Sequence, residues 1–158
     1  MASNSISNSL PRSQTNVTDR TEPASLSSFI SLAGRVLFSA IFLLSGFLHF
    51  SQQDISYAEH AGVPMAGFLV PASGVLALAG GLSILLGYRA KLGAWLLVVF
   101  LIPVTLMMHN FWAVKDPLMA QMQMAMFFKN VSILGGALMV TQFGAGGLSL
   151  DARRNSYR

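Results

Sequence analysis

Four apolar runs, each about 20 residues long, constrain the fold of this chain more than any other feature. They cover residues 29–50, 67–87, 92–111 and 124–143. A run of this length matches the hydrocarbon core of a bilayer, where backbone groups have no water to bind and a helix satisfies them internally. We therefore expect an all-α integral membrane protein, a four-helix bundle whose spans run antiparallel, up and down.

The composition is also typical of an integral membrane protein. The 158 residues are 53% hydrophobic and only 10% charged, and the mean hydropathy is +0.57. A soluble domain of this size cannot bury so much apolar surface. The absence of cysteine excludes disulfides, thiol nucleophiles, iron–sulfur clusters and covalently attached c-type haem. The net charge of +4 comes from scattered Lys and Arg, so we expect the lipid bilayer as a partner and no nucleic acid.

The two ends of the chain differ in composition from the apolar runs. Residues 1–28 are rich in Ser, Asn and Thr and have no apolar period, which predicts a disordered tail. This stretch lacks the basic start and apolar core of a signal peptide. Residues 148–158 form a second, basic tail. The expected transmembrane domain therefore covers residues 29–147.

Basic residues are divided unevenly between the two sides of the membrane. With four spans, both termini and the loop after the second span lie on one side. That side carries Arg12, Arg20, Arg35, Arg89, Lys91, Arg153, Arg154 and Arg158. The other side has only Lys115 and Lys129. The positive-inside rule then predicts that the N and C termini are cytoplasmic.

Helical spacing predicts which faces of the spans look inward. In the first run, one polar and small face is formed by Arg35, Ser39, Phe42, Gly46 and His49. We interpret Arg35, near the start of this run, as an anchor whose side chain reaches the membrane interface. The second run carries a ridge of small residues for close helix approach, made of Gly74, Ala77 and Gly81.

Two segments between the apolar runs carry sequence signals for helices. Residues 55–61 can form a short helix before the Gly62-Val63-Pro64 breaker. Asp116 followed by Pro117 is typical of an N-cap and a first helical residue, so the fourth helix is predicted to begin well before its apolar run.

Polar residues gather where the spans meet the outer side of the membrane. Lys129 lies inside the fourth apolar run, where a charge facing lipid costs roughly 2.5 to 3.5 kcal/mol. It therefore points to a protein neighbour, a water-filled cavity or the interface. The antiparallel order brings it close to residues at the ends of the first and third runs. The candidate ligand-binding residues at this end are Lys129, Asn130, His109, His49, Asn110 and Trp112.

Two interpretations of this cluster stay open. In the first, it binds a small anionic or quinone-like ligand: Lys129 donates, the imidazoles of His49 and His109 donate or relay protons, and Phe111 and Trp112 form apolar walls. In the second, these side chains only satisfy helix ends, because the Lys129 ammonium can reach the headgroups and His and Trp are common interface residues.

Other cofactors have less support in the sequence. Two histidines on different helices are the minimum for binding a b-type haem, which is weak support for it. No set of His, Asp and Glu has the spacing of a defined metal site, so we expect none. The sequence therefore leaves the cofactor open: a quinone is compatible with the cluster, and a haem has less support.

A series of short motifs runs through the membrane domain between residues 32 and 151. The motifs are Gly34-Arg35, Ser45-Gly46-Phe47, Gly62-Val63-Pro64, Gly80-Gly81-Leu82, Leu85-Leu86-Gly87, His109-Asn110-Phe111-Trp112, Phe128-Lys129-Asn130, Gly135-Gly136 and Gly146-Gly147-Leu148-Ser149-Leu150-Asp151. In order and spacing, this series resembles the DoxX family of small bacterial membrane proteins. Two positions depart from that family, which often has a lysine at His49 and a glutamate at Ala77.

The resemblance to the DoxX family implies a multi-pass protein of the bacterial inner (plasma) membrane. It also implies an accessory subunit of a quinone-linked or thiol/oxidative-stress redox system, with an oxidoreductase as partner. Whether the chain is itself an enzyme stays open. One alternative is a non-catalytic membrane scaffold that docks a partner protein. A small solute permease is less well supported, because four helices enclose little space unless they form a homo-oligomer.

Overall fold

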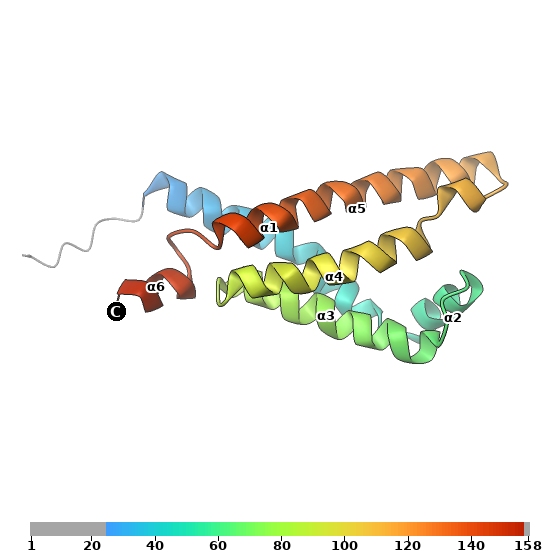
Figure 1. The fold of residues 1–158 in the computed structure, drawn as a ribbon, viewed down its shortest axis with the longest axis horizontal. Coiled ribbons are helices and arrows are strands. Elements are labelled where there is room, and N and C mark those ends of the chain that lie inside the picture. The colour runs from blue at the N-terminus through green and yellow to red at the C-terminus, as the bar shows by residue number, and fades with distance from the viewer. Residues whose placement is uncertain (1–24, 157–158) are drawn as a thin grey trace, which may run out of the picture.

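The computed structural model describes residues 25–156, and the N-terminal part of the predicted disordered tail, residues 1–24, lies outside the described residues. The elements are α1 (Leu26–Leu48), α2 (Gln52–His60), α3 (Ala66–Leu86), α4 (Ala90–Met108), the short 3-10 turn η1 (Phe111–Ala113), α5 (Pro117–Phe143) and α6 (Leu150–Ser156). Helices α1, α3, α4 and α5 are long and apolar enough to cross a membrane. This confirms the predicted all-α bundle of four up-and-down spans (Figure 1).

The four long helices pack in the order α1, α3, α4, α5, so that α3 and α4 lie in the middle. The edge position of α5 leaves only 11% of its span buried, compared with 39% for the span that contains α4. The short helix α2 lies at one end of the bundle and α6 at the other (Figure 1). We call these the histidine end, which holds His49 and His109, and the arginine end, which holds Arg35 and Asp151.

Small residues let the middle helices approach closely. A Cβ atom built on Gly74 would lie 2.9 Å from the Gly46 carbonyl oxygen, and one built on Gly80 would lie 2.8 Å from the Gly93 carbonyl oxygen. The backbones of α1 and α3, and of α3 and α4, are therefore in direct contact. The predicted ridge of α3 is confirmed, because Gly74, Ala77 and Gly81 are all buried.

The two local signals between the runs are also confirmed. Helix α2 forms where a short helix was expected, and the Ser51 hydroxyl accepts a hydrogen bond from the Asp54 N–H at its start. Helix α5 begins at Pro117, and the Asp116 side chain accepts a hydrogen bond of 2.8 Å from the Met119 N–H. The fourth span therefore extends beyond its apolar run at the histidine end.

The inward face predicted for the first run is confirmed within α1, whose buried residues are Arg35, Ser39, Phe42 and Gly46. His49, the last predicted member of this face, lies directly after the helix and is half-buried. The interpretation of Arg35 as an anchor that reaches the interface is wrong, since only 6% of this residue is exposed. Its guanidinium donates a hydrogen bond to the Leu148 carbonyl oxygen. The physical reason is that the chain after α5 folds back over the start of the bundle and covers the guanidinium.

Asp151 attaches the folded-back segment to the turn between α3 and α4. Its carboxylate accepts hydrogen bonds from the Arg89 N–H (2.8 Å) and the Ala90 N–H (3.0 Å), and its own N–H donates to the Gly87 carbonyl oxygen (2.8 Å). A carboxylate is a favourable cap for the free N–H groups at a helix start. Asp151 therefore caps α4 from a distant part of the chain.

We predict that Gly80→Ala destabilises the bundle by about 1–3 kcal/mol, the usual cost of overpacking. The new methyl group would lie 2.6 Å from the Leu97 Cδ2 atom as well as against the α4 backbone. Thermal unfolding in detergent measures the effect. Gly135→Ala is the matched control, because its Cβ meets nothing within 4 Å and alanine favours a helix. Equal melting temperatures of the two variants would contradict the close α3–α4 contact.

Candidate ligand pocket at the histidine end

A pocket of about 540 Å³ opens at the histidine end, and all of the helices except α6 contribute to its lining. This volume lies within the usual range of small-molecule sites. Most of the walls are apolar, with Phe42, Phe100 and Leu101 from the core among them. The polar side chains in the lining are Ser45, His49, Asp54, Tyr57, Ser73, His109, Lys129 and Asn130. The pocket therefore combines mostly apolar walls with a smaller set of polar groups.

Four of the six predicted site residues line this one pocket: His49, His109, Lys129 and Asn130. Asn110 and Trp112 are not in its lining. The reason is that α4 ends at Met108 and the chain turns into η1, which carries Trp112 onto the side of α5. There the Trp112 ring packs edge-on against Phe127, with ring centroids 5.8 Å apart, and it remains 60% exposed.

Phe111 also lies away from the lining, although it was expected as an apolar wall. Its ring centroid is 5.1 Å from that of Trp112 and 5.5 Å from that of Phe127. The aromatic residues of η1 thus form a cluster with α5 beside the pocket. The pocket walls come instead from α1, α3 and α4, at positions that the sequence analysis treated only as apolar.

His49 lies directly after α1, and its Nδ1 atom is 2.6 Å from the Ser45 carbonyl oxygen. A carbonyl oxygen can only accept a hydrogen bond, so Nδ1 carries the proton and donates it. In the neutral ring, Nε2 is then an acceptor that can take up a second proton. The ring also packs edge-on against Phe100, with centroids 5.7 Å apart. These two contacts define the orientation of the imidazole.

His109 is oriented by a chain of two hydrogen bonds that reaches α2. Its Nδ1 atom lies 2.7 Å from the Gln123 Oε1 atom, and the Gln123 amide nitrogen donates to the Tyr57 hydroxyl over 3.1 Å. Because the amide oxygen accepts, His109 Nδ1 is the donor, and its Nε2 is free to accept. The sequence placed Gln123 at this end but contained no signal that it joins His109 to Tyr57.

Lys129 and Asn130 are neighbours on α5 and differ in their surroundings. Asn130 is buried, with 7% of its surface exposed, whereas Lys129 is exposed and its Nζ atom lies 3.5 Å from the Met126 Sδ atom. No hydrogen bond joins the Asn130 amide to another residue within residues 25–156. Lys129 forms no salt bridge in the same part of the chain. Both side chains therefore have donors available to a ligand.

The lining groups suit an amphipathic molecule better than a metal ion. Within the described range, no three His, Asp or Glu side chains lie close enough to hold a metal. The pocket instead offers an ammonium, an amide and two imidazole Nε2 atoms around an apolar slot. Such groups can bind a carbonyl, hydroxyl or anionic head and can exchange protons with it.

We predict that Gln123→Leu weakens the attachment of α2, because the hydrogen bond from the Gln123 amide nitrogen to the Tyr57 hydroxyl is lost. One bond of about 0.5–1.5 kcal/mol corresponds to roughly fivefold faster local opening. Hydrogen–deuterium exchange of Gln52–His60 measures this opening. Gln121→Leu is the matched control, since Gln121 makes no side-chain hydrogen bond in the described chain. Equal exchange in the two variants would refute the link.

The fold and the pocket define the class of this protein: a multi-pass membrane protein with a four-helix up-and-down bundle. A sequence model of the SURF4 family matches residues 1–157, so the chain belongs to the SURF4 family. The assignment to the DoxX family is therefore wrong. The motifs that suggested it are mostly pairs of glycines and aromatic residues at span ends, which closely packed spans share for physical reasons.

Relatives come from both bacteria and yeasts. Inner membrane protein YqjF of Escherichia coli (strain K12) is 30% identical over 126 residues, which cover 78% of this chain and 91% of that protein. ER-derived vesicles protein ERV29 of Saccharomyces cerevisiae is 31% identical over 83 residues, 52% of this chain and 26% of that protein. The Surfeit locus protein 4 homolog of Schizosaccharomyces pombe is 30% identical over 131 residues, 82% of this chain and 39% of that protein.

The chain thus spans between about a quarter and two fifths of the length of these yeast relatives, and nearly all of the bacterial one. No solved structure matches. The predicted multi-pass membrane protein is confirmed, and the bacterial relative is an inner membrane protein, as expected for this chain.

Proposed function

We propose that the pocket at the histidine end binds a small amphipathic molecule that enters from the membrane. The observation that carries this proposal is the convergence of His49, His109, Lys129 and Asn130, from three helices, on one apolar pocket of about 540 Å³. The ring or chain of the ligand occupies the apolar slot. Its polar head lies between the ammonium and amide of α5 and the two imidazoles.

A quinone-like molecule fits the chemistry of these groups. A carbonyl oxygen of the ligand accepts hydrogen bonds from the Lys129 ammonium and the Asn130 amide. A hydroxyl group, as in the reduced form, donates to the free Nε2 atom of His49 or His109. The Nδ1 atoms of both imidazoles donate to protein oxygens, so Nε2 is the atom available to accept a hydrogen bond from the ligand.

The proposal concerns binding and does not include electron transfer. The oxidoreductase partner and the role as a redox subunit were implied by the DoxX resemblance, and that family is now replaced by SURF4. The lining of the pocket supports ligand binding independently of the family assignment. Ligand binding by a SURF4-family membrane protein is the function that follows from this lining.

Docking of a partner protein is a second candidate, and one observation favours it. Large apolar side chains are exposed on η1 and the first half of α5, next to the pocket. They are Trp112, Leu118, Met119, Met122 and Phe128. Exposed apolar residues that lie together often mark an interaction surface. A docking function would not require the four polar residues of the pocket, and this difference separates the two candidates.

We predict that a short-chain ubiquinone analogue quenches Trp112 fluorescence in a saturable way in a Trp95→Phe background. Lys129→Met should weaken the binding by roughly ten- to a hundredfold, because a hydrogen bond to a charged group contributes about 1.5–3 kcal/mol. Lys115→Met is the matched control, since Lys115 lies at the same end outside the lining. Absence of saturation, or equal losses in the two lysine variants, would refute ligand binding and favour docking.

A further inference from the structure

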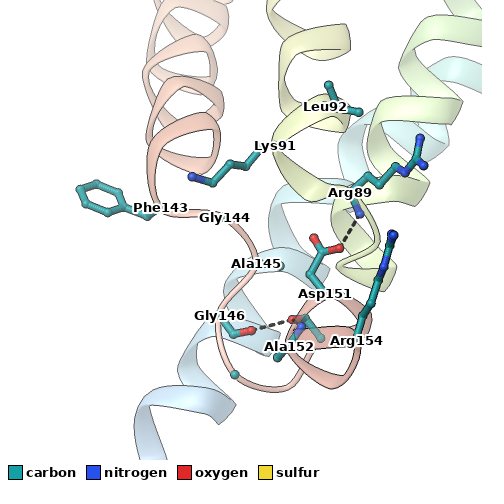
Figure 2. Close-up of a pocket in the computed structure, with 12 residues that line it drawn as sticks. Arg89, Lys91, Leu92, Phe143, Gly144, Ala145, Gly146, Asp151, Ala152 and Arg154 are labelled. Atoms are coloured by element: carbon teal, nitrogen blue, oxygen red, sulfur yellow. Dashed lines mark hydrogen bonds between the residues drawn. The ribbon is translucent and has the colours of Figure 1, made fainter. Parts of the chain in front are cut away.

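A second groove, of about 650 Å³, lies at the arginine end, remote from the proposed ligand pocket. It is enclosed by the end of α5, the loop that follows it, the start of α4 and the short helix α6 (Figure 2). This volume is also within the range of small-molecule sites. Neither the family assignment nor the proposed function gives this groove a role.

The groove carries an excess of positive charge. Arg89 and Lys91 come from the start of α4, and Arg154 comes from α6. The only acidic residue in the lining is Asp151, and both of its carboxylate oxygens accept hydrogen bonds from the α4 backbone, as Figure 2 shows for the bond to Arg89. In the described part of the chain, none of the three basic side chains forms a salt bridge. The Arg89 guanidinium lies over the Tyr88 ring, with its Cζ atom 5.8 Å from the ring centroid, so the charges of Lys91 and Arg154 are the ones available to an anion.

A buried cation, Arg35, lies behind the floor of the groove and interacts with the Asp151 carboxylate. The loop from Gly144 to Ser149 separates the groove from the buried Arg35, whose guanidinium donates to the Leu148 carbonyl oxygen behind it. Lys91 is held at the side of the groove, because its Nζ atom donates to the Gln142 carbonyl oxygen over 2.7 Å. An ammonium group has three donors, so two remain for a ligand.

Apolar side chains border the same groove on the side of the spans. Leu92 on α4 is 58% exposed and Phe143 at the end of α5 is 77% exposed. Phe143 points away from the loop in Figure 2. In a bilayer, exposed side chains at these positions contact acyl chains close to the headgroups. A free phosphate ion would use the cations but would gain nothing from this apolar border.

We propose that the groove at the arginine end binds an acidic phospholipid of the surrounding bilayer. The phosphate group binds the Lys91 ammonium, which extends toward the end of α5 in Figure 2, and an acyl chain follows Leu92 and Phe143 toward the hydrocarbon core. Arg89 and Arg154 extend to the other side of the groove and add positive charge there. The site is independent of the pocket at the histidine end, and either can exist without the other.

The test uses the full chain purified in mild detergent and titrated with phosphatidylglycerol or phosphatidylcholine, with bound lipid counted by native mass spectrometry. We expect retention of phosphatidylglycerol in preference to phosphatidylcholine. Lys91→Gln should weaken it about fivefold, because a basic side chain at an anionic lipid surface contributes about 1 kcal/mol. Lys91→Arg, which keeps the positive charge, should retain most of the phosphatidylglycerol binding. Arg153→Gln is the matched control, since it removes the same charge outside the lining of the groove.

Three results would overturn the proposal. One is equal retention of the two lipids, and another is an equal loss in Lys91→Gln and Arg153→Gln, which would indicate a general charge effect. The third is thermal stabilisation by inorganic phosphate that equals the stabilisation by phosphatidylglycerol, which would indicate a site for free anions. If Lys91→Gln does not fold, Arg154→Gln replaces it, because the Arg154 side chain is exposed and makes no hydrogen bond in the described chain.

Discussion

The direct backbone contact between neighbouring helices is the constraint on which the rest of this structure depends. Lipid provides no hydrophobic force that drives one apolar helix onto another, so close packing has to hold the spans together. Glycine pairs allow this contact, Gly46 with Gly74 and Gly80 with Gly93. The first pair also places His49, because a Cβ atom on Gly74 would lie 2.8 Å from the His49 Cβ atom. The packing of α1 on α3 therefore positions a polar group of the pocket.

Polar side chains join distant parts of the chain at both ends of the bundle. At the arginine end, Asp151 caps α4, and the Arg35 guanidinium donates one hydrogen bond to the Leu148 carbonyl oxygen of the returning chain. The Nε and Nη1 atoms of Arg35 are buried without a partner in the described residues. At the histidine end, Gln123 joins α5 to His109 and to Tyr57 on α2. Polar groups at membrane depth are costly when they lack partners. These links allow polar pockets to form beside helices that otherwise pack through apolar and small residues.

Much of this arrangement could be predicted from the sequence, because it follows from length and period. Run lengths predicted four spans, helical spacing predicted the buried face of α1, and the antiparallel order brought His49, His109 and Lys129 to one end. The hydrogen bond of Arg35 could not be predicted, since its partner Leu148 lies 113 residues later. The turn that carries Trp112 away from the pocket depends on where α4 ends. Short motifs of small and aromatic residues also proved too common to identify the family.

The central claim is that the polar groups at the histidine end form a binding site. The most direct measurement is mass spectrometry of small molecules that copurify with the full chain from mild detergent. The wild type is compared with a Lys129→Met/His49→Leu variant and with Lys115→Met. The proposal predicts one amphipathic species that is enriched with the wild type and with Lys115→Met, and lost from the double variant. Identical small-molecule profiles for all three proteins would contradict it.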